Sequence, residues 1–209
     1  GTVILTIFGF NSSSPDPVSQ QSTVTISHLP VVNAGNDQLI CNGETCSLSG
    51  TVSYSNFYHW STSGNGTFTN SNALVTNYIP GTQDIANGSV TLTLTANSIS
   101  PCSGTVSDNM LLTISTLSVS AGNNQSILIG STTTLNGTVT GGSGNYTYSW
   151  TPANLVINPT DATTQTVGIF ENTTFTLTVT DANYGCSNSA TVSISVEGQL
   201  LSIETNATE

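Results

Sequence analysis

A strand-like string that occurs three times constrains the fold of this chain more than any other feature. The strings GTVILTIFG, GSVTLTLTA and NTTFTLTVT begin at residues 1, 88 and 172, and each alternates apolar with polar residues. Each leads through a loop rich in Ser, Asn, Gly or Pro into a second alternating run. Alternation with a period of two is typical of strands that bury one face. The chain therefore contains several copies of one supersecondary unit.

The segments between these strings also align. Gly35 matches Gly122 at an offset of 87 residues, and Trp60 matches Trp150 at an offset of 90. Within one period, about seven short alternating runs are separated by turn motifs such as NG, SG and GNG. This density of short strands is typical of an immunoglobulin-like β-sandwich, in which a buried Trp lies on the third strand. We therefore expect an all-β fold of tandem immunoglobulin-like sandwiches in a rod-like array, with both tryptophans in the cores.

The copies predict domain boundaries. Residues 1–30 match the last two strands of a repeat whose earlier strands are missing, and 31–116 and 117–197 match complete sandwiches. Residues 198–209 are expected to be a linker or the start of a further repeat. The junctions around Pro30 to Gly35 and Leu117 to Gly122 are short, so we expect neighbouring repeats to be joined semi-rigidly.

The charge composition excludes several partners. The chain has no Lys or Arg and 11 Asp and Glu residues, which gives a formal net charge of −11. No basic patch can bind phosphates, so neither nucleic acid nor an anionic membrane surface is an expected partner. No apolar run is long enough to span a membrane. Four cysteines without a CxxC motif are typical of an extracellular, oxidising setting.

No pattern in the sequence indicates an enzyme. His28 lies in a junction, and His59 precedes Trp60 on a strand, so these two neighbouring side chains point to opposite faces. No nucleophile motif accompanies them. No cofactor is expected; Asp37, helped by Asn33 and Asn36, is a weak calcium candidate, and its ordinary interpretation is a turn residue that accepts backbone N–H groups.

Aromatic residues are the candidate platforms for a sugar. By alternation, Tyr146 and Tyr148 share the face of Trp150 and should point inward. Tyr184 lies in a loop and is the expected surface aromatic. Single exposed aromatics are common, so this signal for a polysaccharide partner is weak.

Several strings resemble a known family. AGNDQLICNGE, WSTSGNGTF and YIPGTQDIANGSVTLTLTA resemble the PKD-like repeats of very large bacterial surface proteins, and GGSGNYTYSWTPA resembles a second variety from the same proteins. The resemblance covers nearly the whole chain, although the PKD string WDFGDG is absent. The most similar parent type is the giant gliding-motility adhesin exported by type IX secretion. The resemblance implies a bacterial cell-surface location, long tandem arrays and adhesion.

The resemblance also implies a pairing of cysteines. In the family, the Cys of LICNGE pairs with the Cys of SPCSG, which here would link Cys41 to Cys102. In the next copy Leu128 stands in place of the first cysteine, so Cys186 is expected to be free. Cys46 is expected to be a small core residue, and a Cys46–Cys102 bond is the alternative pairing.

Together these observations predict a non-enzymatic structural or adhesive segment of a long extracellular adhesin. Its expected partners are neighbouring repeats of the same chain, with surface polysaccharide or the secretion and motility machinery as further candidates. Two alternatives stay open. One is a carbohydrate-binding accessory region of a secreted enzyme. The other is a filament subunit in which residues 1–30 are a hairpin donated to a neighbour.

Overall fold

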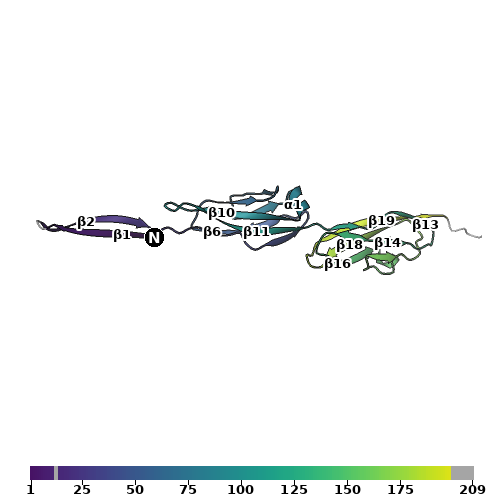
Figure 1. Cartoon of the computed structure of the whole chain (residues 1–209). Helices are drawn as coiled ribbons and strands as arrows, with labels where there is room; N and C mark the ends of the chain where they lie inside the picture. The colour runs from purple at the N-terminus through teal and green to yellow at the C-terminus, as the bar shows by residue number, and fades with distance from the viewer. Residues whose placement is uncertain (12–13, 199–209) are drawn as a thin grey trace, which may run out of the picture. The chain divides into compact units, whose positions relative to one another are not determined.

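The computed structural model describes residues 1–11 and 14–198, so nearly all of the expected terminal segment 198–209 lies outside the described residues. The chain divides into two compact units (Figure 1). The first unit comprises Gly1–Gln38 and Glu44–Thr113, and the second comprises Leu39–Gly43 and the chain from Ile114 onward. This division falls three residues before the boundary expected after residue 116, and it includes residues 1–30 in the first unit. The three expected domain boundaries, after residues 30, 116 and 197, remain predictions of the sequence pattern.

The first unit begins with a two-stranded antiparallel hairpin. Strand β1 (Thr2–Asn11) pairs with β2 (Ser14–Thr25), and Val3 lies opposite Val24. The alternating apolar residues form strands, as the pattern predicts, but every described side chain of both strands is exposed.

Two further sheets follow in the first repeat. One has the order β4-β11-β10-β7, with the strands β4 (Gln38–Cys41), β11 (Thr105–Ser115), β10 (Ser89–Asn97) and β7 (Tyr58–Thr62). The other has the order β5-β9-β8, with the strands β5 (Cys46–Ser49), β9 (Val75–Ile79) and β8 (Thr67–Phe68). Short strands β3 (Val31–Asn33) and β6 (Thr51–Ser53) pair with each other. Alternate residues of β10 are buried, because each strand turns one face toward the core.

A short helix, α1 (Thr82–Asn87), interrupts the strands just before β10. The sequence pattern predicts only strands here. The helix ends at Gly88, whose φ of +72° is the left-handed conformation that glycine adopts most readily.

The second unit contains the same four-stranded arrangement. Its main sheet has the order β13-β19-β18-β16, with the strands β13 (Gln125–Leu128), β19 (Ser187–Glu197), β18 (Thr173–Asp181) and β16 (Tyr146–Thr151). Figure 1 shows β16, β18 and β19 side by side. The remaining pairs are β14 (Thr134–Asn136) with β17 (Thr163–Gln165) and β12 (Ser118–Ser120) with β15 (Thr138–Thr140), and a 3-10 turn, η1, spans Ala153–Leu155.

The equivalent strand orders confirm the internal repeat on which the expected fold rests. In both sheets a strand from the start of a repeat lies beside the last strand of that repeat, and β13 runs parallel to β19. The chain is all-β apart from its short helical turns, and its repeats are immunoglobulin-like β-sandwiches.

Candidate functional sites

The two tryptophans occupy equivalent buried positions. Trp60 on β7 is 2% exposed and Trp150 on β16 is fully buried, so both lie where the sequence predicts. Each indole N–H donates to a backbone carbonyl, from Trp60 to Ala73 at 3.1 Å and from Trp150 to Asp161 at 2.9 Å. These hydrogen bonds satisfy the one polar atom of each ring, so the rest of the indole can be buried without an unpaired donor.

A glycine makes room beside each tryptophan. A Cβ atom at Gly50 would come within 2.9 Å of the Trp60 ring, and one at Gly137 would lie 2.6 Å from the carbonyl oxygen of Ala162. Both glycines occur in the aligned GTV segments of the two repeats. The backbone between two short strands, β5 and β6 in the first repeat and β14 and β15 in the second, must therefore lack a side chain at this point.

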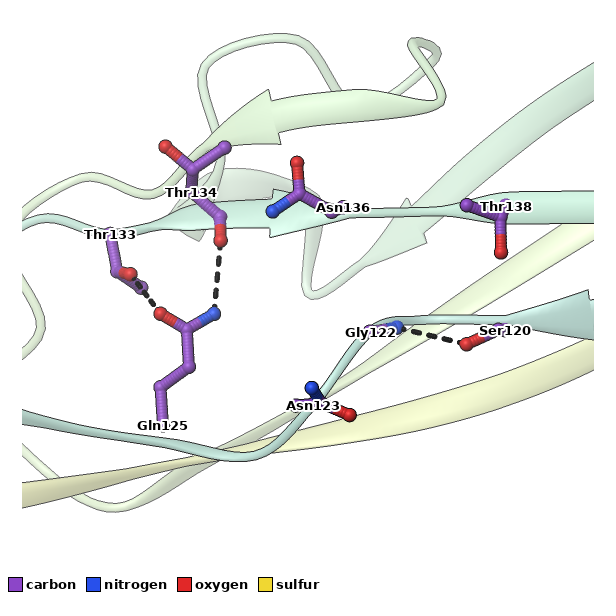
Figure 2. A pocket seen from close by; sticks show the side chains of 8 residues that line it. All are labelled: Ser120, Gly122, Asn123, Gln125, Thr133, Thr134, Asn136 and Thr138. Atoms are coloured by element: carbon purple, nitrogen blue, oxygen red, sulfur yellow. Dashed lines mark hydrogen bonds between the residues drawn. The ribbon is translucent and has the colours of Figure 1, made fainter.

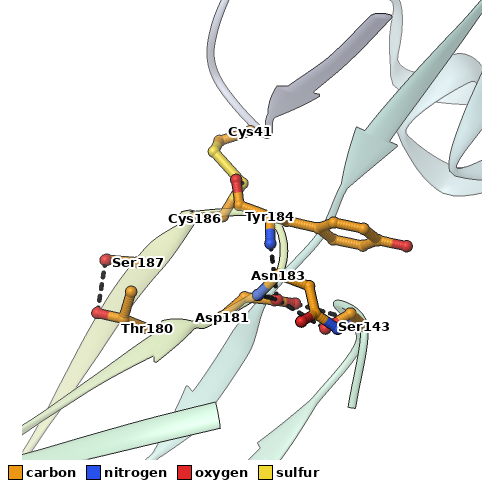
Figure 3. The surroundings of a disulfide bond; sticks show 8 residues. All are labelled: Cys41, Ser143, Thr180, Asp181, Asn183, Tyr184, Cys186 and Ser187. Atoms are coloured by element: carbon orange, nitrogen blue, oxygen red, sulfur yellow. Dashed lines mark hydrogen bonds between the residues drawn. A yellow bond between two sulfur atoms is a disulfide. The ribbon is translucent and has the colours of Figure 1, made fainter. Parts of the chain in front are cut away.

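The predicted disulfide is wrong. Cys41 is bonded to Cys186, with a Cα–Cα distance of 5.5 Å, and Cys102 and Cys46 are free. The expectation that Cys186 is a free thiol is wrong for the same reason. The bond joins the end of β4 to the loop before β19, two segments of the second unit that are 145 residues apart in sequence (Figure 3). The family pairing lies within one repeat, whereas the two bonded cysteines belong to different sequence repeats.

The two free cysteines lie in different environments. Cys46 on β5 is fully buried, as expected of a core residue, and its Sγ lies 3.5 Å from Oε1 of Gln38. Burial raises the pKa of the Cys46 thiol, which makes it a poor nucleophile. Cys102 is half-buried, and its Sγ lies 3.8 Å from the carbonyl oxygen of Ser27.

Asp181 orders the loop that carries Cys186. Its fully buried carboxylate accepts hydrogen bonds from the N–H and hydroxyl of Ser143 and from the N–H groups of Asn183 and Tyr184 (Figure 3). Burial alone would raise the pKa of Asp181, but these hydrogen bonds outweigh it and lower the pKa to about 2. The carboxylate of Asp181 therefore caps its own turn at Asn183 and Tyr184 and also anchors the turn containing Ser143.

Asp84 has the corresponding role in the first unit, and the sequence analysis missed it. Its buried carboxylate accepts hydrogen bonds from the Tyr78 hydroxyl at 2.7 Å and from the N–H groups of Asn65, Gly66 and Gly81. Burial opposes ionisation, but the hydrogen bonds prevail and lower the pKa of Asp84. A signal was present, because a carboxylate three residues after Gly81 fits the capping box of a helix N-terminus.

The weak calcium candidate, Asp37, has a protein partner. Its Oδ1 accepts a hydrogen bond from the N–H of Leu111 at 2.8 Å, and Asp108 likewise accepts from the N–H of Ala34. Within residues 1–11 and 14–198, no group of three or more His, Cys, Asp or Glu side chains could hold a metal ion. The partner of Asp37 lies on β11, far away in sequence, whereas the sequence analysis anticipated a partner within the local turn.

The expected aromatic positions are scattered. Tyr146 and Tyr148 pack against the core of the second unit, and Tyr184 is 40% exposed. The ring of His28 packs against that of Tyr54 at a tilt of 32° with ring centroids 4.7 Å apart, and His59 is exposed. The structure does not bring these side chains together into one platform.

A polar groove in the second unit is the site that the sequence analysis did not identify. Its volume is about 590 Å³, and it lies between the segment from Ser120 to Gln125 and the segment from Thr133 to Thr138 (Figure 2). The lining consists of Ser120, Gly122, Asn123, Gln125, Thr133, Thr134, Asn136 and Thr138. Each of these residues is either an uncharged polar residue or a glycine.

Gln125 links the two sides of this groove. Its amide nitrogen donates to the carbonyl oxygen of Thr134 at 3.0 Å, and its amide oxygen accepts from the hydroxyl of Thr133. Gly122 keeps the segments close, because a Cβ atom there would lie 3.1 Å from the carbonyl oxygen of Asn136. Hydrogen bonds and a close backbone contact that belong to the fold therefore fix the spacing of the two segments that line the groove.

Comparison with known proteins supports the fold class. No protein-family model and no curated protein matches the chain. The solved structure of a variant of titin domains I67–I69 is 14% identical, with a TM-score of 0.51, and the match covers 94% of this chain and 75% of that one. Mouse cadherin-23 EC22–24 is 15% identical with a TM-score of 0.39 and coverages of 81% and 67%. The insect immune protein hemolin is 11% identical with a TM-score of 0.48, and the match covers 93% of this chain and 56% of hemolin.

At these identities the comparisons bear on the fold alone. The titin match agrees with the strand orders described above, so the chain consists of immunoglobulin-like sandwich domains. In the part of the chain that the structure describes, no helix is long and apolar enough to cross a membrane.

Proposed function

We propose that this chain is a structural and adhesive repeat segment of a long extracellular cell-surface adhesin. The observation that carries the proposal is the hairpin β1–β2, which has the strands of a sandwich but not the rest of its core. On one face of β1, Val3, Leu5 and Ile7 are 43%, 52% and 72% exposed. A two-stranded hairpin with these exposed side chains is marginally stable in water by itself.

The same positions are buried in a complete repeat. In the alignment of the repeats, Val3, Leu5 and Ile7 correspond to Val90, Leu92 and Leu94 of β10, which are 4%, 0% and 0% exposed. The pairing register agrees as well, because Val3 lies opposite Val24 and Val90 lies opposite Leu112. Residues 1–30 are thus best explained as the last two strands of a preceding sandwich, and three copies in 209 residues favour a longer array.

The proposed role of the repeats is mechanical. Successive sandwiches hold a binding region away from the cell, and the cross-strand hydrogen bonds and buried cores protect the backbone from proteases. The absence of Lys and Arg removes every cleavage site for trypsin-like proteases. The net charge of −11 keeps parallel filaments from associating.

The resemblance to PKD-like repeats supports a more specific version of this proposal. In that version the parent is a bacterial gliding-motility adhesin exported by type IX secretion, and the neighbouring repeats of the same chain are the main partners. Surface polysaccharide and the secretion or motility machinery are the further partners. The proposal assigns no catalytic role to the chain.

The size of the native polypeptide tests the proposal. We expect a denaturing gel of the native protein, with peptide mapping by Asp-N and Glu-C, to show a chain of many hundreds of residues or more. The map should contain peptides of sandwich strands upstream of Gly1. A native chain of about this length would contradict the array, and it would favour a filament subunit that donates residues 1–30 to its neighbour. A catalytic domain in the map would instead favour the accessory region of a secreted enzyme.

A further inference from the structure

We infer that the polar groove of the second unit binds a neutral oligosaccharide. Its volume of about 590 Å³ lies within the range of about 300–1,000 Å³ that is typical of small-molecule sites. The groove is formed by segments of one unit, and the hydrogen bonds of Gln125 hold both sides in place. A ligand would therefore enter a preformed site and would not have to order it.

The chemistry of the lining selects the class of ligand. No lining residue is charged, so an ionic ligand would lose hydration without gaining a counter-charge. The lining has no aromatic or large aliphatic side chain, so an apolar ligand would gain little from burial. A neutral polyhydroxylated ligand fits both conditions, because its hydroxyl groups can donate and accept in turn.

Two amides provide the unused hydrogen-bonding groups. Asn123 and Asn136 lie on opposite sides of the groove (Figure 2), and neither side chain makes a hydrogen bond to another residue in the described part of the chain. Each amide carries one acceptor oxygen and two N–H donors. Such a group can bind adjacent hydroxyls of a sugar ring, accepting from one and donating to the other.

The first repeat lacks this pair. At the aligned positions it has Asn36 and Ser49, so only one of the two amides is present. Because no aromatic ring lines the groove on which a sugar could stack, a single site should bind in the millimolar range, about −4 kcal/mol at 1 mM. Further copies of the second repeat in an array would add such sites and provide avidity.

Nuclear magnetic resonance titration of the full 209-residue chain tests this inference. The probes are cellohexaose, xylohexaose and mannohexaose, with hexagalacturonate as the anionic comparison. We expect at least one neutral hexasaccharide to shift the side-chain amide signals of Asn123, Gln125 and Asn136. The double variant Asn123→Ala, Asn136→Ala should weaken binding by about fivefold or more. Both residues are exposed and lie outside the core, so the variant should fold.

The matched control is Asn36→Ala, Ser49→Ala in the first unit, which should leave the affinity unchanged. The inference is overturned if none of the three neutral sugars shifts these signals up to about 20 mM, well above the expected dissociation constant. It is also overturned if both double variants lose binding equally, or if hexagalacturonate binds as well as the neutral sugars. A binding site in this groove would deepen the proposed adhesive role. The outcome of the titration does not depend on the length of the native chain, which is the separate test of the array.

Discussion

Replacement of Tyr78 by Phe should destabilise the first unit by a predictable amount. The Tyr78 hydroxyl donates to Oδ2 of Asp84 at 2.7 Å, lies 2.9 Å from the hydroxyl of Thr62, and accepts from the N–H of Gly66 at 3.1 Å. The ring is fully buried, so water cannot replace these partners. Burial and the neighbouring Asp84 raise the pKa of Tyr78 to about 12, so the hydroxyl stays protonated at neutral pH and can donate.

The magnitude follows from which partners keep a hydrogen bond. After the substitution the N–H of Gly66 still donates to Asp84 at 3.0 Å, so no backbone donor is orphaned. The loss is mainly one hydrogen bond to a charged group, which contributes about 1.5–3 kcal/mol. We expect the free energy of unfolding to fall by about 2 kcal/mol, and with an m-value of about 1 kcal/mol/M the urea midpoint should fall by about 2 M.

Urea unfolding monitored by hydrogen exchange and mass spectrometry is the suitable assay, because peptides report the two units separately. Tyr58→Phe is the matched control: Tyr58 is half-buried, and in the described part of the chain its hydroxyl makes no hydrogen bond. This control should cost less than about 0.5 kcal/mol, as ordinary surface changes do. Equal midpoints for the two variants would refute the assignment of Asp84 and Tyr78 as the buried anchor of this unit.

Three further predictions concern the carboxylates, the disulfide and the packing. Folding lowers the pKa values of Asp84 and Asp181. Their ionised carboxylates therefore stabilise the fold above about pH 4, and this stabilisation is lost as the pH falls toward 2. A urea midpoint that is unchanged between pH 5 and pH 2.5 would contradict this. Asp-N with Glu-C digestion of the unreduced chain should join peptide 37–44 to peptide 181–197, whereas a link from 37–44 to 84–107 would restore the Cys41–Cys102 pairing. Gly137→Ala should destabilise the second unit by about 1–3 kcal/mol through overpacking, while exposed Asn136→Ala should be nearly neutral, and equal urea midpoints would refute the close packing at Gly137.

Local patterns account for the successes of the sequence analysis. A strand repeats every two residues, so the apolar positions of GSVTLTLTA specify which side chains face a core. Copies of that pattern predicted the sandwiches and the burial of Trp60 and Trp150. The hairpin at residues 1–30 could be recognised in the same way, because its strands have the alternation and order of a repeat end.

The features that the sequence analysis missed depend on residues far apart in the chain. A local capping box marks Asp84 as the residue that caps a helix, but its role as a buried anchor follows only when Tyr78 and the turn at Asn65 are placed around it. The polar groove exists because two segments of the second unit run beside each other at a spacing set by Gly122 and Gln125. The spacing of the two groove segments has no periodicity that a linear pattern could show.

The sequence by itself determined the all-β class, the repeat and the core positions, because strand alternation is local and each copy confirms the others. Only the tertiary structure decided the cysteine pairing, since Cys41 and Cys186 are 145 residues apart and come from different repeats. A disulfide requires Cα atoms within about 7 Å, and that proximity is a property of the folded chain.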